Sequence, residues 1–208
     1  MSNDERVSRR GLIAGIGAVA AGAALSAPSI AEDGDHKEKE AGRDHEAWHG
    51  KVDAWLAKQE ITDLRRQYAL ATDLIGMNTK ESVARGRAIY RRIFTADAKI
   101  GATGQPRVTG PDAWVDIANS ALKDYKDTQH LIGTQVVDLK SLPGADGKGA
   151  DASMSSYLQA WHATKDDQVW LFIGTYYDKL TYTPENGWQI YDMELKQVSG
   201  DRRKITVT

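Results

Sequence analysis

The stretch GTYYDKLTYTPENGWQI, residues 174–190, decides the fold. Its Thr, Tyr, Trp and Ile residues favour β-strands. Between them lies the cluster TPENG, whose Pro, Asn and Gly residues are typical of turns. The stretch therefore predicts two long strands joined as a β-hairpin.

The same composition recurs on the N-terminal side of this hairpin. Clusters such as PGADGKG and KDD separate segments rich in Val, Ile, Thr, Tyr and Trp. Regularly spaced segments of this kind predict an antiparallel meander of four long strands. The four segments are residues 129–139, 152–164, 168–182 and 187–198.

Three helices are predicted before these strands. The first has an apolar stripe at three- and four-residue spacing and ends near Gly76. The second fits residues 80–94, and the third begins at Pro111, a favoured first-turn residue. Helices followed by a meander indicate an α+β fold. We expect a cone-shaped, strongly curved antiparallel sheet, closed by three N-terminal helices, with a deep apolar pocket. The first stripe consists of Trp55, Ile61, Leu64, Tyr68, Ala71 and Ile75.

Composition narrows the function classes. The chain has 208 residues, enough for one domain with a core, and a formal net charge of -2. This charge does not suggest a nucleic acid or an anionic membrane as partner. The absence of cysteine excludes disulfides, thiolate nucleophiles and thiolate metal sites.

The N-terminus has the pattern of a signal peptide. Ser8-Arg9-Arg10 precedes an uncharged Gly/Ala-rich run at residues 11–25, and Ala31 ends a small-residue cleavage site. The paired arginines predict twin-arginine export of residues 32–208 to the periplasm, without stable membrane association after cleavage. An uncleaved anchor is the alternative. Residues 32–45 read as a charged disordered leader, residues 46–200 as the domain and 201–208 as a tail.

HEAWH, residues 45–49, matches the zinc-hydrolase pattern H-E-x-x-H. His45 and His49 would provide two ligands, but a catalytic zinc site needs a third. No histidine follows at the usual spacing, and Gly50 weakens the helix. Glu60 could substitute, although nothing marks it. We therefore predict no metal site, with an exposed first helical turn as the simpler interpretation.

The remaining chemistry is acid–base catalysis, and two other histidines are available for it. His130 and His162 both lie on predicted strands. His130 is expected to share a face with Ile132 and Thr134, because side chains alternate along a strand. Each histidine is either a packed structural residue or a group that faces the pocket.

Several segments together resemble the SnoaL-like group of the nuclear transport factor 2-like superfamily. The resemblance covers roughly residues 50–200 and includes the 174–190 hairpin. It implies the cone fold and enzymes without cofactors: steroid isomerases, scytalone and bile-acid dehydratases, a hexachlorocyclohexane dehydrochlorinase, and lyases that release formaldehyde from lignin-derived diaryl compounds. The other segments are ITDLRRQYALATD (61–73), RIFTADAKI (92–100), GPDAWVDIANSAL (110–122) and TQHLIGTQVVDL (128–139).

The resemblance also implies site residues. In the eliminating members, an aspartate at the end of the first helix pairs with a histidine at the start of a long strand, which matches Asp73 and His130. A tyrosine or lysine often lies five residues before the aspartate, which matches Tyr68. Several members have an arginine near the position of Tyr182, and this departure leaves open whether the substrate carries negative charge.

The residues alone leave these roles open. Asp73 lies almost opposite the apolar stripe, so periodicity predicts a solvent-exposed carboxylate unless the helix ends or turns first. Tyr68 is either a core aromatic or, with Tyr182, a hydroxyl that donates to an oxyanion. The candidate substrate-binding residues are Trp114, Trp161, Trp170 and His162, for which structural packing is the alternative.

The resulting hypothesis is an exported, cofactor-independent lyase. It would remove water or formaldehyde from a bulky aromatic (phenolic, lignin-derived) or steroid-like substrate by Asp/His acid–base chemistry. The alternatives are a ketosteroid-type isomerase, a non-catalytic ligand-binding module of the same fold, and the zinc enzyme. By resemblance, a homodimer or homotrimer is expected.

Overall fold

The computed structural model describes residues 32–204, with side chains from residue 45 onward. The predicted signal peptide and residues 205–208 lie outside the described residues. By its contacts the chain divides into residues 1–43 and 44–208, and the fold is that of the second unit. None of the helices in the described part combines the length and apolar character needed to cross a membrane.

Residues 32–204 contain three helices and one sheet. The helices are α1 (Glu32–Gly76), α2 (Lys80–Ile93) and α3 (Pro111–Leu122). A short β-hairpin lies between α2 and α3, and four long strands follow α3, as the sequence predicts. The strands are β1 (Phe94–Ala102), β2 (Val108–Thr109), β3 (Asp127–Ser141), β4 (Asp151–Ala163), β5 (Gln168–Thr183) and β6 (Gly187–Lys204).

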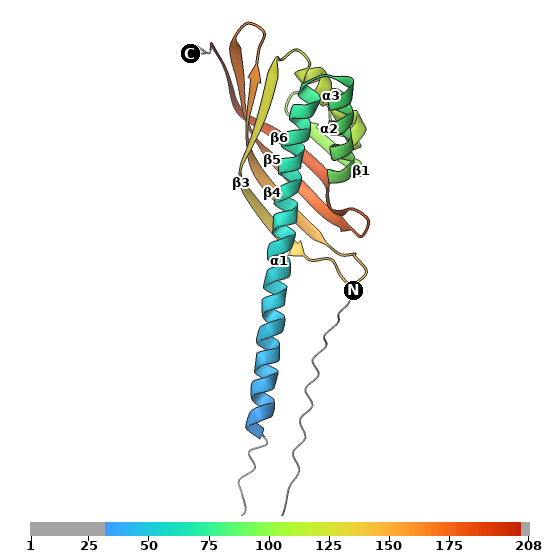
Figure 1. The fold of residues 1–208 in the computed structure, drawn as a ribbon, viewed down its shortest axis with the longest axis vertical. Coiled ribbons are helices and arrows are strands. Elements are labelled where there is room, and N and C mark those ends of the chain that lie inside the picture. Colours follow the sequence, from blue (N-terminus) through green and yellow to red (C-terminus); the bar gives the residue numbers. More distant parts are fainter. Residues whose placement is uncertain (1–31, 205–208) are drawn as a thin grey trace, which may run out of the picture. The chain divides into compact units, whose positions relative to one another are not determined.

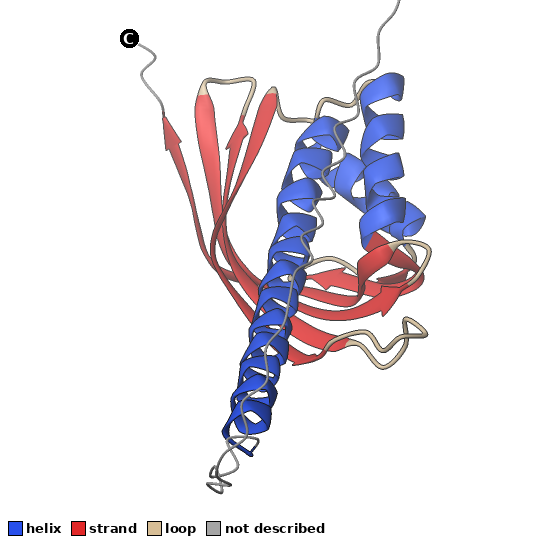
Figure 2. Ribbon diagram, turned by 60° about the horizontal axis from the view of Figure 1, so that its bottom comes forward, coloured by secondary structure: helices blue, strands red, loops and turns tan. Residues whose placement is uncertain are grey.

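The sheet is a single curled layer with strand order β2-β1-β6-β5-β4-β3. Figure 2 shows that it curves around the helices without closing into a barrel. The meander from β3 to β6 is antiparallel, as predicted. The sheet as a whole is mixed, because β1 pairs with β6 in parallel, so the expectation of a purely antiparallel sheet is wrong. The α+β cone is confirmed (Figure 1).

Two helix boundaries differ from the prediction. α2 ends at Ile93, and Phe94 starts β1 with an extended backbone. Its fully buried ring makes edge contacts with Tyr68 and Tyr90, which explains the change from helix to strand. α1 begins at Glu32, so the segment expected to be a disordered leader is helical. Its Glu, Lys and Ala residues are strong helix formers, and this favours the longer helix.

The apolar stripe of α1 is confirmed except at its start. Trp55 is 59% exposed, and the buried side of α1 begins at Ala57. The predicted end at Gly76 is correct, and a Cβ there would lie 2.7 Å from Thr128 Oγ1. Only glycine therefore allows β3 to pass so close to the last turn of α1.

The core contains one ion pair. Arg65 of α1 and Asp178 of β5 are both fully buried and are joined by two hydrogen bonds. The Arg65 guanidinium lies 4.5 Å from the ring centre of Tyr68 and 3.9 Å from that of Tyr176. Such cation–π contacts help to offset the loss of water around the guanidinium. The pair therefore links α1 to the middle of the sheet.

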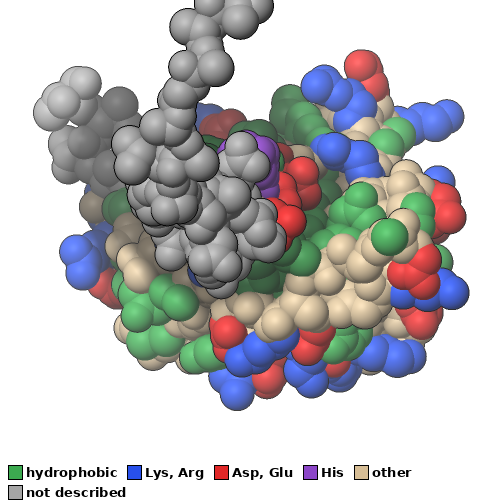
Figure 3. Space-filling view, turned by 90° about the horizontal axis from the view of Figure 1, so that it is seen from below, with side chains coloured by type: hydrophobic (Ala, Val, Ile, Leu, Met, Phe, Trp, Pro, Cys, Tyr) green, Lys and Arg blue, Asp and Glu red, His purple; other side chains and the backbone are tan. Residues whose placement is uncertain are grey.

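The surface carries charges of both signs. Where described side chains are visible in Figure 3, basic and acidic groups are interspersed rather than gathered into one patch. This distribution agrees with the net charge of -2.

Candidate active site

Asp73 and His130 form a hydrogen-bonded pair. His130 Nδ1 lies 2.7 Å from Asp73 Oδ1. A carboxylate only accepts hydrogen bonds, so Nδ1 carries the proton and Nε2 has the free lone pair of the neutral ring. No described residue hydrogen-bonds to Nε2. The pair therefore presents one basic nitrogen for a proton transfer.

Two further donors hold the carboxylate. The Thr128 hydroxyl donates to Asp73 Oδ1 at 3.0 Å, and the His130 backbone N–H donates to Oδ2 at 3.2 Å. β3 is an edge strand, so alternate backbone N–H groups have no neighbouring strand to bond. Asp73 satisfies one of them. Its side chain is 26% exposed, against 7% for His130, so the expectation of a simple surface carboxylate is wrong.

A bulge in β3 determines which of its side chains face inward. The register with β4 shifts between Gly133 and Gln135, and Thr134 has φ 37°. His130 and Ile132 share the inner face, as predicted, but Thr134 is exposed and lies in the bulge. The bulge lets the residues on both sides of it direct their side chains to the core.

His162 lies beside His130 on the next strand. The two rings meet edge to face with centres 5.5 Å apart. His162 Nδ1 is 3.2 Å from the Trp170 carbonyl oxygen, so Nδ1 donates and Nε2 is an acceptor. Burial lowers the pKa of His162 to about 4, with a smaller contribution from the charge of His130. His162 is therefore neutral near pH 7.

Two tyrosines, from α1 and β5, line the same cavity as the two histidines. Trp114 Nε1 donates to the Tyr68 hydroxyl at 2.9 Å, which leaves the Tyr68 proton available for another acceptor. Tyr176 packs edge-on against Tyr68. Burial raises the pKa of Tyr176 well above its usual value, so its hydroxyl stays protonated as a donor.

These groups surround one cavity of about 170 Å³ between the sheet and the helices. Five of the predicted site residues line this cavity. Asp73 does not line it, because it lies behind His130. No Lys, Arg, Asp or Glu is among the lining residues, so the wall is uncharged unless a histidine is protonated. Aromatic and aliphatic side chains complete the wall. The predicted residues on it are Tyr68, Trp114, His130, His162 and Trp170.

Two predicted site residues lie elsewhere. Trp161 is on the outer face of β4 and is 41% exposed, because it alternates with the inward-facing His162. Tyr182 lies at the far end of β5, where its ring contacts Trp188, and it does not line the cavity. The predictions that Tyr182 donates to an oxyanion and that Trp161 stacks on the substrate are therefore not supported by their positions.

The HEAWH segment is an exposed part of α1. His45 and His49 are adjacent, with Nε2 atoms 3.2 Å apart. Across the residues with described side chains, no three His, Asp or Glu side chains gather in a way that could hold a metal ion. The zinc-enzyme interpretation therefore gains no third ligand.

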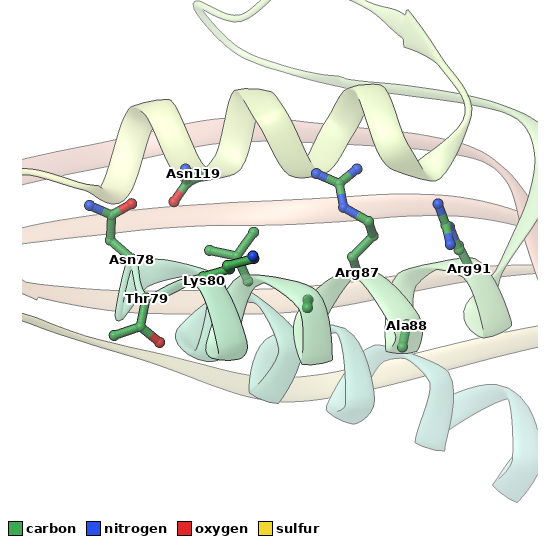
Figure 4. Close-up of a pocket in the computed structure, with 9 residues that line it drawn as sticks. Asn78, Thr79, Lys80, Arg87, Ala88, Arg91 and Asn119 are labelled. Atoms are coloured by element: carbon green, nitrogen blue, oxygen red, sulfur yellow. The ribbon is translucent and has the colours of Figure 1, made fainter.

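A second hollow, of about 470 Å³, lies between α2 and α3. Figure 4 shows Arg87 reaching from α2 toward α3, with Asn119 on the facing helix. Arg87 and Arg91 are held by Asp112, and Arg87 also by Asp116. These cations are therefore engaged in joining the two helices. The hollow contains no histidine.

Sequence reasoning missed three residues of the site. Thr128 could have been found, since it lies two residues before His130 and must share its face. Thr128 contacts Asp73 and does not line the cavity, whereas Tyr176 and Phe172 line it from the inward-facing positions of β5. In the sequence these two residues do not differ from the Val, Tyr and Trp residues around them, so the pattern did not single them out.

Comparison with known proteins identifies the domain. A family model described as a SnoaL-like domain matches residues 53–194. No protein of curated function matches the chain significantly.

Solved structures show the same fold at low sequence identity. A hexachlorocyclohexane dehydrochlorinase, LinA-type3 from Novosphingobium barchaimii, is 15% identical with a TM-score of 0.60, covering 76% of this chain and 98% of its own. A protein provisionally named scytalone dehydratase, from Novosphingobium aromaticivorans, is 16% identical with a TM-score of 0.57, covering 76% and 93%. The Kfla4162 protein from Kribbella flavida is 21% identical with a TM-score of 0.56, covering 71% and 95%.

Proposed function

The chain belongs to the SnoaL-like domain family, and from this premise we propose that it is a cofactor-independent lyase. It removes water or formaldehyde from a bulky aromatic, phenolic or steroid-like molecule. The observation that carries this proposal is the 2.7 Å contact between Asp73 and His130, with the histidine ring on the cavity wall. A base held in one tautomer on the wall of a mainly apolar cavity suits proton abstraction.

The reaction needs one base that also acts as an acid. His130 Nε2 takes a proton from the carbon adjacent to the one that bears the leaving hydroxyl. The C–H electron pair forms the new double bond, and the C–O bond breaks. The imidazolium, stabilised by Asp73, then returns its proton to the leaving hydroxide, and water departs.

A phenolic substrate allows the second outcome. A quinone methide forms when the phenol loses its proton and the benzylic C–O bond breaks, with that oxygen leaving as water or, in a cyclic aryl ether, as the opened phenol. His130 can then take the proton of a hydroxymethyl group on the neighbouring carbon. The C–C bond then breaks, formaldehyde departs, and the electron pair of that bond restores the aromatic ring. Tyr68 and Tyr176 both line the cavity, and we assign their hydroxyls as donors to a developing oxyanion.

The lining of the cavity favours a substrate whose reacting part is uncharged. Its wall has no charged residue apart from a histidine in its protonated form, and several aromatic rings can stack on a flat molecule. Its volume of about 170 Å³ is below the roughly 300–1,000 Å³ typical of sites for drug-sized ligands. A compact ring system therefore fills it, and the rest of a larger substrate extends through its mouth.

The test is turnover by protein starting at Glu32, with EDTA present, on phenolic diarylpropanes, phenylcoumarans and hydroxysteroids. Mass spectrometry should detect loss of water or formaldehyde. We expect His130→Gln to lower kcat about 10²-fold or more, the scale of general acid–base catalysis. The exposed His49→Gln variant is the matched control and should keep full activity.

Other outcomes would replace the proposal. A product of unchanged mass would indicate the ketosteroid-type isomerase. Binding without any reaction would indicate the non-catalytic module. Activity that EDTA abolishes and His49→Gln removes would indicate the zinc enzyme.

We also propose that the chain is exported through the twin-arginine route. The support is the Ser8-Arg9-Arg10 pattern ahead of the uncharged run. Cell fractionation should find the mature chain in the periplasm. Replacement of Arg9 and Arg10 by Lys should retain the precursor in the cytoplasm, and unchanged export would contradict this route.

Self-association is the remaining part of the proposal, with a second copy of this chain as the partner. The outer face of β3, β4 and β5 carries apolar side chains, each at least 41% exposed, in neighbouring rows of the sheet. Clusters of this kind typically mark interaction surfaces. Light scattering should find a dimer or trimer that Trp161→Glu dissociates, and a monomeric parent would contradict this. The cluster consists of Leu131, Val136, Tyr157, Trp161 and Tyr177.

A further inference from the structure

His45 and His49 form a pair of imidazoles that the proposed reaction does not use. Both side chains are exposed on α1, ahead of Ala57, where the buried side of the helix begins. Residues four positions apart are neighbours on a helix surface, so the two rings lie on one face of α1. Neither ring packs into the core, and the packing of the fold therefore does not account for the pair.

The ring nitrogens of the pair already lie at a chelating distance. Nε2 of His45 and Nε2 of His49 are 3.2 Å apart, and the ring centres are 4.3 Å apart. Histidine nitrogen binds zinc at about 2.0–2.1 Å. Two such nitrogens on one ion stand about 2.8–3.4 Å apart, as the angle between them goes from a right angle to the tetrahedral value. The observed separation lies within this range, so one ion fits between the two nitrogens.

The tautomers of the two rings can both suit a metal ion. In the present contact one Nε2 donates its proton and the other Nε2 accepts it. When both protons are on Nδ1, both Nε2 lone pairs are available to a cation on the same side of the helix. The ion then replaces one hydrogen bond between neutral rings by two metal–nitrogen bonds. No other described side chain has to be displaced, because the pair is exposed.

This pair differs from the catalytic zinc site that the HEAWH pattern suggests. Such a site takes three protein ligands, and among the residues with described side chains no third His, Asp or Glu gathers with the two histidines. On α1 the cavity wall begins at Tyr68. At 1.5 Å per residue, about 28 Å of helix separates Tyr68 from His49. A metal ion on the pair is therefore remote from His130.

We propose that His45 and His49 form a two-ligand site for a divalent transition-metal ion, with Cu(II) bound more tightly than Zn(II). Imidazole nitrogen suits both ions, and the affinity of a given site falls from copper to zinc. The protein supplies two neighbouring nitrogens, and water occupies the remaining positions around the ion. The site does not depend on the proposed lyase, because none of its ligands lines the cavity.

Calorimetry with copper chloride and zinc chloride tests the site, on protein that starts at Glu32 and carries no histidine tag. We expect saturable copper binding that is tighter than zinc binding. Electron paramagnetic resonance should show nitrogen ligands on the bound copper. His45→Gln and His49→Gln should each lower the copper affinity about 10²-fold or more, because the second ligand of a chelate acts at a high effective concentration.

The matched control keeps the number of histidines and changes only their spacing. In the double variant His49→Gln, Ala47→His, the second histidine lies two residues from His45, where helical side chains do not face each other. It should bind copper as weakly as His49→Gln alone. The His130→Gln variant should bind copper as the parent does, whether or not the parent turns over any substrate.

Three results would overturn the site. The first is the absence of saturable copper binding to the parent. The second is an unchanged copper affinity in His45→Gln and His49→Gln, or full affinity in the variant with altered spacing. The third is the loss of binding in His130→Gln, which would assign the copper to the cavity. Circular dichroism of each variant checks that the fold is intact.

Discussion

Asp73 shows how a neighbouring element changes the role of a single residue. On α1 it points away from Tyr68 and the apolar stripe, which is why periodicity predicts an exposed carboxylate. The start of β3 runs past that side of the helix and provides three donors from Thr128 and His130. The side chain thus holds the proposed base, His130, while its other side still meets water.

Replacing Asp73 by Asn tests this role. The amide keeps the shape but not the charge that stabilises the His130 imidazolium, and it no longer enforces one tautomer. We expect kcat to fall about 10²-fold or more, with little change in KM, in steady-state assays. Asp63→Asn, an exposed change on the same helix, is the control. Equal activities of the two variants would rule out the pair.

His162 should make stability depend on pH. Its pKa is about 4 in the folded protein, against an ordinary value of 6.5. Between these values the unfolded chain binds the proton and the native chain does not. Stability is therefore fully present above pH 6.5 and is lost as pH falls toward 4.

Urea unfolding of His162→Gln and the parent at pH 7 and pH 5 measures this effect. On going to pH 5 the parent should lose about 2 kcal/mol more than the variant. The variant is the reference because glutamine does not titrate. Parallel losses in the two proteins would show that His162 is not held neutral.

At the scale of elements, the site depends on how closely α1 and β3 approach. Gly76 ends the helix and leaves room for Thr128, which donates to Asp73. Further along β3, the bulge at Thr134 keeps the inner face continuous on both sides. The edge of the sheet and the end of the helix therefore form the Asp73–His130 pair together.

Gly76→Ala should separate these two elements. The new methyl group would lie 2.7 Å from Thr128 Oγ1, so β3 or the threonine must move. We expect a loss of about 1–3 kcal/mol in unfolding free energy and a lower kcat. Gly50→Ala is the matched control, since a Cβ there meets nothing within 4 Å. It should stabilise the exposed helix by about 0.5–1 kcal/mol, and similar effects of both variants would contradict the close approach.

At the scale of the whole molecule, the Arg65–Asp178 pair joins the helical layer to the sheet. Asp178→Asn would leave the buried guanidinium without a counter-charge, so we expect a loss of about 3–5 kcal/mol. The double variant Arg65→Met, Asp178→Leu removes both charges and should be more stable than Asp178→Asn. Chemical denaturation measures both, and an equally unstable double variant would assign the effect to packing.

The sequence by itself determined the elements, their order and the α+β class. Hydrophobic periodicity, turn residues such as those of TPENG, and Pro111 act over a few neighbouring positions, so local physics is enough to read them. The resemblance supplied the pair Asp73 and His130, which periodicity alone would have separated. Local patterns also missed the end of α2, because the burial of Phe94 is a tertiary contact.

Only the tertiary structure decided which side chains meet. Trp161 and Trp170 have similar strand contexts, yet one faces solvent and the other the cavity, because the sheet curls around one of its faces. Tyr182 is separated from the site by the length of β5, and Thr128 and Tyr176 come to it from two strands. These contacts depend on strand register and sheet curvature, which arise only when the elements pack together.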